Sequence, residues 1–335
     1  MKAIQMTETG GPGVLKLVEV PDPTPGPGQV LIRVQSAAVN FLDVIRRKGD
    51  PYPDPTRMPF IPGAEVAGTV EALGEGVEGP AVGTPVFAVV GEYTEGGYAE
   101  LAVANSYSVI PVPEGVELDS AAGLLIVGLS ATVLLTEVAG VTEASTVFIP
   151  AAAGGLGSFA VQISKALGAT VIAGAGSEGK RQVALGLGAD HAIDYRQTDW
   201  PARVRELTDG KGADVVLETL GPGHLPQSMA ALAPFGKLVV YGAVNGLDAA
   251  KIDGPALYPL IYDPAPSQSL IGFNVGTWFV DRPEAVVGAM GKLVGWVADG
   301  TVKGLVSTTL PLADASEAHR MLEAGTSTGK IILKP

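Results

Sequence analysis

Three small residues stand at the spacing of a nucleotide-binding turn. Ala152, Gly154 and Gly157 occupy the three glycine positions of the dinucleotide fingerprint, with alanine as a mild departure in the first. The second position lets the backbone approach a pyrophosphate, the third lets helix and strand pack closely, and free N–H groups of the helix attract the anion. We therefore predict that this turn, with Gly155 and Leu156 inside it, binds a dinucleotide. A purely structural glycine turn is the alternative.

The residues that follow the next expected strand bear on which dinucleotide is bound. An NAD site usually carries an acidic residue about twenty residues after the fingerprint, where it binds the ribose 2′-hydroxyl. Here the sequence Gly-Ala-Gly stands at 174–176, so no carboxylate repels a 2′-phosphate. Ser177, Lys180 and Arg181 follow as a hydroxyl and two cations. The expected cofactor is NADPH, unless the two cations only solvate the start of a helix.

The elements around this turn predict a doubly wound parallel sheet. Residues 147–149 form a short apolar run typical of a buried strand, and the helix after the turn carries one apolar stripe that ends near Gly168. Further strands alternate with helical segments, which favours the Rossmann arrangement of an α/β fold. The expected strands after the turn are 170–173, a strand that ends at about Asp194, 213–219, 237–243 and, as the sixth of the sheet, 269–275.

The first 124 residues have the pattern of a mainly β, partly closed barrel. Short strands separated by turn-rich segments are expected at 2–6, 15–20, 30–38, 64–73, 84–89, 97–103 and 108–111. A helix over 121–138 is expected to lead into the nucleotide domain. Helices over 284–299 and 312–323 and a strand over 330–334 are expected to return to the barrel. The predicted domains are 1–124 and 279–335 for the catalytic part and 125–278 for the NADPH-binding part.

Composition excludes several classes of function. A net charge of −13 argues against nucleic acid and anionic membrane as partners. The uncharged stretches 120–136 and 144–164 are not expected to span a membrane, because the first is shorter than about 20 residues and the second contains the glycine turn. The sequence has no cysteine, which fits a cytoplasmic setting, and its start predicts no signal peptide.

Seven segments occur in a characteristic order along the chain: AAVNFLDVIRRKG, PFIPGAEVAGTV, GGYAEL, GLSATVLL, PAAAGGLG, GADHAIDYR and GKIILKP. In this order and spacing they resemble the zinc-free quinone oxidoreductase family of the medium-chain dehydrogenase/reductase superfamily. The resemblance covers essentially the whole chain and implies a Rossmann domain inserted into a GroES-like catalytic domain.

The zinc-dependent relatives provide a contrast. Where they carry zinc ligands this sequence has Asn40, Ala64 (followed by Glu65) and about Val127. Its three histidines, which read as turn or helix surface, are far apart in the sequence, so no metal site is expected. The histidines are His191, His224 and His319.

Without a metal, one class of hydride acceptor is favoured. Reduction of a simple ketone leaves a localised alkoxide that a Lewis acid stabilises. A quinone or an α,β-unsaturated carbonyl spreads the charge onto a remote oxygen, where a few hydrogen-bond donors can hold it. We therefore expect NADPH-dependent reduction of a quinone or enone.

The resemblance implies a set of residues around the nicotinamide and the substrate. Asn40 would donate to the substrate oxygen or the nicotinamide amide, or would cap the helix that follows it. Asp43 would be an ordering group rather than a base. Tyr52 would polarise the carbonyl or deliver the final proton, or would only pack its loop. The Ser130 hydroxyl would meet the nicotinamide.

The resemblance also implies contacts to the rest of the cofactor. Lys180 and Tyr195 match positions that hold the 2′-phosphate, with Ser177 as a helper. Gly242 matches a backbone contact near the nicotinamide ribose. Lys330 stands where the family often has an arginine that reaches the cofactor, and it is a candidate substitute.

Two other functions stay open. Enoyl-thioester reduction would favour a basic lip, which Arg46, Arg47, Lys48 and Arg57 would provide unless they are an ordinary solvated helix face. A non-catalytic NADPH-binding protein is the other alternative. A homodimer is expected by resemblance, with the segment SLIGFNV as an edge strand that pairs with its twofold mate.

Overall fold

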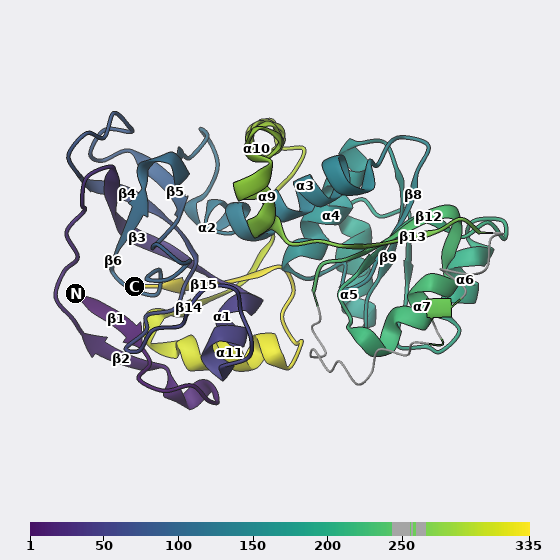
Figure 1. Ribbon diagram of the computed structural model, residues 1–335, viewed down its shortest axis with the longest axis horizontal. Helices are drawn as coiled ribbons and strands as arrows, with labels where there is room; N and C mark the ends of the chain where they lie inside the picture. The colour runs from purple at the N-terminus through teal and green to yellow at the C-terminus, as the bar shows by residue number, and fades with distance from the viewer. Residues whose placement is uncertain (243–254, 256, 259–265) are drawn as a thin grey trace. The chain divides into compact units, whose positions relative to one another are not determined.

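The chain divides into two units in a computed structural model that describes residues 1–242, 255, 257–258 and 266–335. One unit comprises residues 1–128 and 304–335, and the other comprises residues 129–303 (Figure 1). The first division falls four residues after the expected boundary at 124. The second falls at 303 and not at 278, because helix α10 (Pro283–Ala298) packs on helix α3 (Leu129–Val133) of the same unit.

The unit formed by residues 129–303 contains the predicted doubly wound parallel sheet. Its strand order is β10-β9-β8-β11-β12-β13, and every pair is parallel. The first strand in sequence, β8, lies between β9 and β11, so the strand order reverses there. The fifth strand begins five residues earlier than predicted, and Ala243, its predicted end, lies outside the described residues. The strands are β8 (Thr146–Ile149), β9 (Thr170–Gly174), β10 (His191–Ile193), β11 (Ala213–Glu218), β12 (Leu232–Val240) and β13 (Ser269–Gly272).

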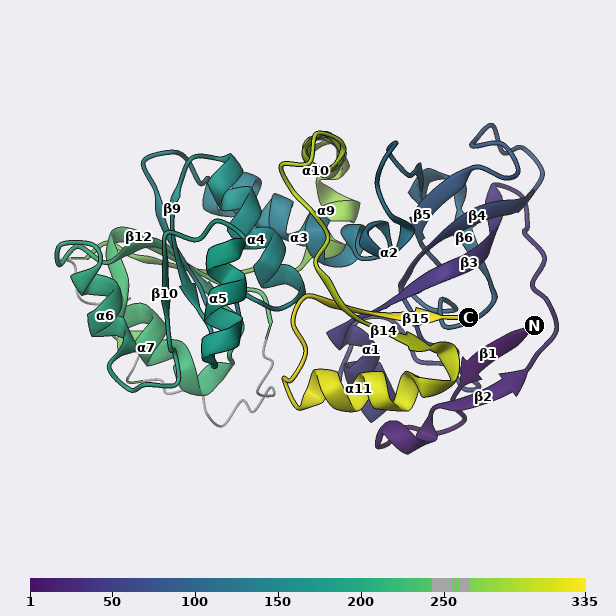
Figure 2. The same ribbon diagram turned by 180° about the vertical axis from the view of Figure 1, so that it is seen from behind.

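Helices cover this sheet, as both ribbon views show (Figures 1 and 2). Helix α4 (Gly155–Ala166) packs on β8 and β9, α5 (Glu178–Gly186) on β9 and β10, and α7 (Leu225–Ala230) on β11 and β12. Helix α6 (Trp200–Glu206) contacts α7, and the Trp200 ring stacks on Phe148 with 4.6 Å between centroids. Gly168 ends α4 with a φ of 85°, as its predicted position required.

The other unit is built on a seven-stranded sheet with the order β14-β15-β3-β4-β5-β7, and β6 pairs with β3 off this path. The first half of β3 pairs with β6 and its second half with β15, so the end of the chain returns to this unit as expected. The strands are β3 (Gln29–Val39), β4 (Glu65–Leu73), β5 (Pro85–Val89), β6 (Leu101–Asn105), β7 (Val109–Pro111), β14 (Val306–Pro311) and β15 (Lys330–Lys334); β1 (Lys2–Gln5) pairs with β2 (Lys16–Glu19).

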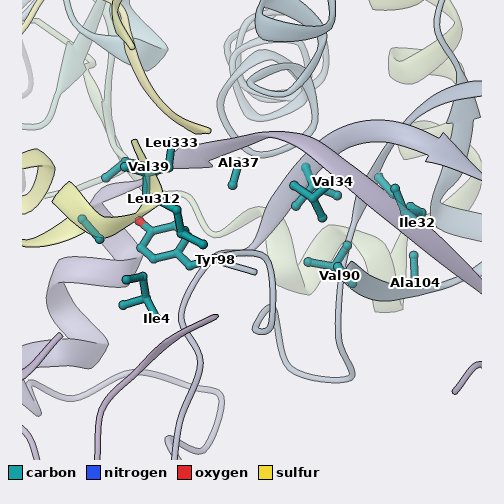
Figure 3. Packing of buried hydrophobic residues seen from close by; sticks show 14 of the residues in the cluster. Ile4, Ile32, Val34, Ala37, Val39, Val90, Tyr98, Ala104, Leu312 and Leu333 are labelled. Atoms are coloured by element: carbon teal, nitrogen blue, oxygen red, sulfur yellow. The ribbon is translucent and has the colours of Figure 1, made fainter. Parts of the chain in front are cut away.

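The core of this unit joins the sheet to the segments around it. Tyr98 packs among Ile4, Leu312 and Leu333, which come from three separate parts of the sequence (Figure 3). Helices α1 (Phe41–Lys48) and α11 (Ala315–Glu323) contact each other. This packing brings the segment after residue 304 against the N-terminal third of the chain.

The helix predicted over 121–138 is broken into four parts. Helix α2 (Leu118–Ala121) and α3 are α-helical, whereas η3 (Leu124–Gly128) and η4 (Leu134–Ala139) are π-helical turns. The cause at η3 is Glu65, whose carboxylate accepts the N–H groups of Leu125 and Ile126 at 3.1 and 2.8 Å. Donors used in this way are withdrawn from the regular helical ladder.

Candidate functional site

The turn between β8 and α4 explains the small residues of the fingerprint. Ala151 has a left-handed backbone with a φ of 51°, so the tight turn is made one residue before the predicted first position. A Cβ on Gly157 would lie 2.3 Å from the Ala151 carbonyl oxygen, and one on Gly154 would lie 3.1 Å from it. Glycine is required at 157, because no rotamer change relieves a clash with the backbone.

The same turn presents N–H groups to a ligand. Gly154 is the N-cap of α4, and Gly155, Leu156 and Gly157 are its first three residues, whose N–H groups have no acceptor within the helix. They follow β8 at the point where the strand order reverses, which is where open α/β sheets bind their ligands. The residues present therefore fit the pyrophosphate of a dinucleotide.

A second group lies around the loop after β9. This strand ends at Gly174, and no acidic residue occupies 174–176. The Ser177 hydroxyl caps α5 by accepting the Lys180 N–H at 3.4 Å. A Cβ on Gly176 would lie 3.6 Å from the Tyr195 hydroxyl, so this phenol lies beside the loop that leads into Ser177 and Lys180. Burial lowers the pKa of Lys180, whose partly desolvated ammonium would gain from an anionic neighbour.

The second cation predicted here, Arg181, is paired with carboxylates. Its guanidinium pairs with Glu178 at 2.8 Å and with Asp194 at 3.2 Å. Arg196 also pairs with Asp194, and these contacts hold the pKa of that carboxyl well below its usual range. Lys180 is therefore the better candidate for the 2′-phosphate. A pocket of about 430 Å³ beside this loop is lined by Tyr195, Arg196, Gln197, Thr198, His224 and Gln227.

The carboxyl end of β11 carries a buried acidic group that the sequence did not indicate. Glu218 is fully buried and accepts the N–H groups of Leu220 and Gly221 at 2.6 and 3.0 Å and the hydroxyl of Ser228. It fixes the turn after β11. Gly242 follows β12, and a Cβ there would lie 2.9 Å from the Thr219 hydroxyl oxygen. In the same unit, Ser130 lies in α3 and is 7% exposed.

The other unit holds a buried ion pair that includes two predicted site residues. The Lys330 ammonium donates to Asn40 Oδ1 at 2.6 Å and to Glu65 Oε1 at 3.1 Å, and all three residues are at most 3% exposed. The Asn40 amide nitrogen donates to Glu65 at 3.0 Å and to the Ala38 carbonyl at 3.4 Å. Both the oxygen and the nitrogen of the Asn40 amide thus form hydrogen bonds within the protein. The Lys330 ammonium, which was a candidate contact to the cofactor, does so too.

Asp43 lies at the centre of a second buried network. Its carboxylate accepts the N–H groups of Asn40 and Gly63 and the hydroxyl of Tyr98, at 2.9, 3.0 and 3.1 Å. Burial raises the pKa of Asp43 to about 6, although these three donors oppose the shift. Asp43 thus links the start of α1 to the backbone at Gly63, and its role in the site stays a prediction.

His319 corrects a prediction. It was expected on a helix surface, but it is fully buried in α11 with Nε2 3.2 Å from the Tyr98 hydroxyl. Burial, to which the charge of Arg47 adds, lowers the pKa of His319 to about 3, so the imidazole is neutral. The face of α11 that carries His319 packs against the core. The sequence of this nine-residue helix does not by itself indicate which face is buried.

The cations of α1 also differ from the prediction. Arg46 and Arg47 are both fully buried, so they form neither a basic lip nor a solvated face. Arg47 makes a bidentate pair with Glu323 at 2.9 and 3.0 Å, and Lys48 pairs with the same carboxylate. Arg46 lies under the loop that carries Tyr52, with its guanidinium carbon 5.5 Å from the centre of that ring.

The positions that match zinc ligands hold no ligand cluster. Asn40 contacts the Lys330 ammonium, and Ala64 and Val127 have no metal-binding atoms in their side chains. In the part of the chain that the structure describes, no group of three or more histidine, cysteine, aspartate or glutamate side chains is placed to hold a metal ion. No described helix is long and apolar enough to cross a membrane.

Comparison with known proteins agrees with this architecture. Residues 26–114 match the alcohol dehydrogenase GroES-like domain family, and residues 155–285 match the zinc-binding dehydrogenase family. The chain is 34% identical to a quinone oxidoreductase of Pseudomonas aeruginosa, with 100% of this chain and 99% of that protein covered. It is also 34% identical to a 2-haloacrylate reductase of a Burkholderia species, with 97% and 96% covered. A mycobacterial structure complexed with NADPH has a TM-score of 0.89 and 36% identity, with both chains fully covered.

A Rossmann sheet in one unit and a GroES-like sheet in the other define the class of the medium-chain dehydrogenases and reductases. The 34% identity to a quinone oxidoreductase over essentially the full length identifies the family within this superfamily. The chain belongs to the quinone oxidoreductase family of this superfamily.

Proposed function

We propose that this protein binds NADPH and reduces a quinone or an α,β-unsaturated carbonyl without zinc. The observation that supports the proposal most is the loop after β9, where no carboxylate occupies 174–176, Ser177 and Lys180 follow, and the Tyr195 hydroxyl lies beside Gly176. Bound NADPH would supply the hydride. The mycobacterial relative complexed with NADPH supports the same cofactor.

The chain's own residues would bind and orient this cofactor. The N–H groups at the start of α4 would hold the pyrophosphate, and Ser177, Lys180 and Tyr195 would hold the 2′-phosphate. We keep Gly242 as a backbone contact near the nicotinamide ribose and Ser130 as a hydroxyl contact to the nicotinamide. Contacts of this kind set position, which is the main contribution of a protein to hydride transfer.

Of the predicted groups for the acceptor, Tyr52 is the better proton donor. The Asn40 amide already donates to Glu65, and Asp43 is buried among donors of the protein, so both would act by ordering the site. Tyr52 lies in a loop and is partly exposed. Burial raises the pKa of its phenol, which keeps the proton on the oxygen until an acceptor with developing negative charge needs it.

Two observations support this class of acceptor: the names of two relatives, and side chains at 40, 64 and 127 that do not form a zinc-ligand trio. One relative is named for a quinone and the other for a 2-haloacrylate, and both names denote conjugated molecules. Reduction of an enoyl thioester is a weaker alternative, because the two buried arginines of α1 are not available to bind its phosphates.

Parallel assays of three acceptors test this function. NADPH oxidation would be followed with 9,10-phenanthrenequinone, but-3-en-2-one and crotonyl-coenzyme A. Turnover of the first or the second supports the proposal and shows whether the acceptor is a quinone or an enone. Turnover of the thioester alone assigns the protein to enoyl reductases, and no turnover with tight NADPH binding makes it a binding protein.

We also propose a homodimer that forms through strand β13. This strand lies at the end of the sheet order, and its Leu270 is 39% exposed. An edge strand with an exposed apolar side chain is suited to pairing with a copy of itself. Light scattering at micromolar concentration should give the mass of two chains, and the mass of one chain would refute this arrangement.

A further inference from the structure

The guanidinium of Arg46 is fully buried and donates to two loops at once. It donates to the carbonyl of Pro55 at 2.8 Å and to the hydroxyl of Thr56 at 3.2 Å in the loop after α1. It also donates to the carbonyls of Tyr93 and Thr94, at 2.5 and 2.9 Å, in the loop after β5. One side chain thus ties together two segments that are about forty residues apart in the sequence.

The first of these loops needs such a donor. Five prolines stand between residues 51 and 62, so the loop has few N–H groups with which to form its own hydrogen bonds. It offers carbonyl oxygens instead, and an arginine supplies five N–H donors in a fixed plane. In the second loop, Thr94 has a left-handed φ of 57°, a conformation that costs energy outside glycine and persists only where neighbours hold it.

Two aromatic rings of the first loop lie against the same cation. The guanidinium carbon is 4.3 Å from the centre of the Phe60 ring and 5.5 Å from that of the Tyr52 ring. Both distances are within the range of cation–π attraction, which is stronger where the cation is desolvated. The charge of Arg46 also opposes the rise in the pKa of Tyr52 that burial causes.

The neighbouring arginine shows that burial alone does not explain these contacts. Arg47 is equally buried, but its partners are Glu323 and the carbonyl of Gly10. The carboxylate nearest to Arg46 is Glu95 at 3.6 Å, so hydrogen bonds to the loops provide most of its compensation. A buried charge held mainly by backbone carbonyls fixes the geometry of the segments that carry them.

We propose that Arg46 is a positioning residue, which fixes the proline-rich loop so that the Tyr52 phenol is presented to the acceptor. This inference rests on the proposed reductase function and on Tyr52 as its proton donor. A variant without Arg46 would still contain Tyr52, but the orientation of its phenol would no longer be fixed. Turnover would therefore fall, with little change in the affinity for the cofactor.

A double-mutant cycle tests the proposal. The variants are Tyr52→Phe, Arg46→Met and the double variant, with Arg46→Lys as the conservative change that keeps the charge but loses the planar fork. We would measure kcat and KM for the quinone or enone that the parent turns over, together with the NADPH dissociation constant. Trypsin cleavage after the exposed Arg57 would report the order of the loop independently of activity.

The expected results differ from those of a merely structural role. Arg46→Met should lower kcat about tenfold or more, the double variant should be no slower than the slower single variant, and NADPH binding should be unchanged. Cleavage after Arg57 should be faster in Arg46→Met, and Arg46→Lys should recover only part of kcat. Arg33→Met is the control, because this exposed arginine pairs with Glu71 away from both loops.

Three outcomes would overturn the proposal. It is wrong if Arg46→Met keeps the kcat of the parent, or if the losses of the two single variants multiply in the double variant. It is also wrong if Tyr52→Phe turns over as fast as the parent, because no catalytic phenol would then be positioned; an active parent would still support the reductase function. A parent that is inactive with every acceptor would instead refute the proposed function itself.

Discussion

Lys330 shows how a single cation can hold a site together. It is buried against Glu65 and Asn40, so this network compensates its charge. Removing one partner of a buried ion pair leaves the other uncompensated, which usually costs about 3–5 kcal/mol. We predict a loss of that size in the free energy of unfolding of Lys330→Met, measured by urea denaturation. Lys334→Met is the control, since Lys334 is 39% exposed and should cost about 1 kcal/mol or less; equal losses would contradict the account.

His319 makes the fold sensitive to acid. Its pKa is lowered from 6.5 to about 3 in the folded protein, whereas the unfolded chain takes up the proton near 6.5. As pH falls from 6.5 towards 3, the unfolded state binds one more proton than the folded state, so stability is lost over this window. We predict that the free energy of unfolding of His319→Gln falls less than that of the parent between pH 6.5 and 4. Parallel curves for the two proteins would show that His319 is not the group responsible.

Lys180 and Arg181 are adjacent cations with different expected roles. Lys180 is predicted to bind the 2′-phosphate, whereas Arg181 already pairs with Glu178 and Asp194. A hydrogen bond to a charged group contributes about 1.5–3 kcal/mol, which is about ten- to a hundredfold in affinity. Lys180→Ala should weaken NADPH by this factor and leave NADH nearly unchanged, as nicotinamide fluorescence would measure. If Arg181→Ala has the larger effect on NADPH, the assignment of these two residues must be exchanged.

At the scale of elements, the junction of β8 and α4 depends on one glycine. A Cβ at 157 would meet the Ala151 carbonyl at 2.3 Å, so Gly157→Ala must shift the strand or the helix. We predict that this variant loses most NADPH binding and unfolds at a lower temperature. Gly186→Ala in α5 is the matched control, because a Cβ there meets nothing within 4 Å and alanine favours a helix by about 1 kcal/mol. Retention of NADPH affinity in Gly157→Ala would refute the close approach.

Elements with clear periodicity could be predicted from the sequence, and others could not. The apolar runs of β8 and β9 and the stripe of α4 were sufficient for the parallel sheet. Strand β14 was missed because its sequence, VSTTLP, alternates without a strong apolar run. The π-helical turn η3 depends on Glu65, which is sixty residues away, and no local pattern reports such a contact.

The candidate site was predictable in part for the same reason. The glycine turn and the loop after β9 are local, so their spacing was enough to propose Gly154, Gly157 and Lys180, whose roles stay predictions. The burial of Arg46 and His319 depends on packing between segments distant in the sequence, and charged or polar residue types usually favour a surface. The burial of these residues, and of Arg47, was therefore not predictable from the sequence.

At the scale of the whole molecule, one unit is formed by two separate parts of the sequence, and the other unit lies between those parts in the chain. Strand β15 pairs with β3, so residues 304–335 belong to the same unit as the first 128 residues, and the nucleotide-binding unit is inserted between them in the sequence. Lys330 is the first residue of β15, so the last strand of the chain supplies the cation that bonds to Asn40 and Glu65. The carboxyl-terminal segment is thus required for the buried network and not only for the sheet.

The central claim is NADPH-dependent reduction of a conjugated acceptor without a metal. It is tested most directly by kcat/KM with 9,10-phenanthrenequinone and but-3-en-2-one, for NADPH and for NADH, before and after dialysis against a chelator. We predict turnover of at least one acceptor, a preference for NADPH of about tenfold or more, as expected from one charge-assisted contact, and no loss after dialysis. Equal rates with NADH, or activity that the chelator abolishes and zinc restores, would contradict the account.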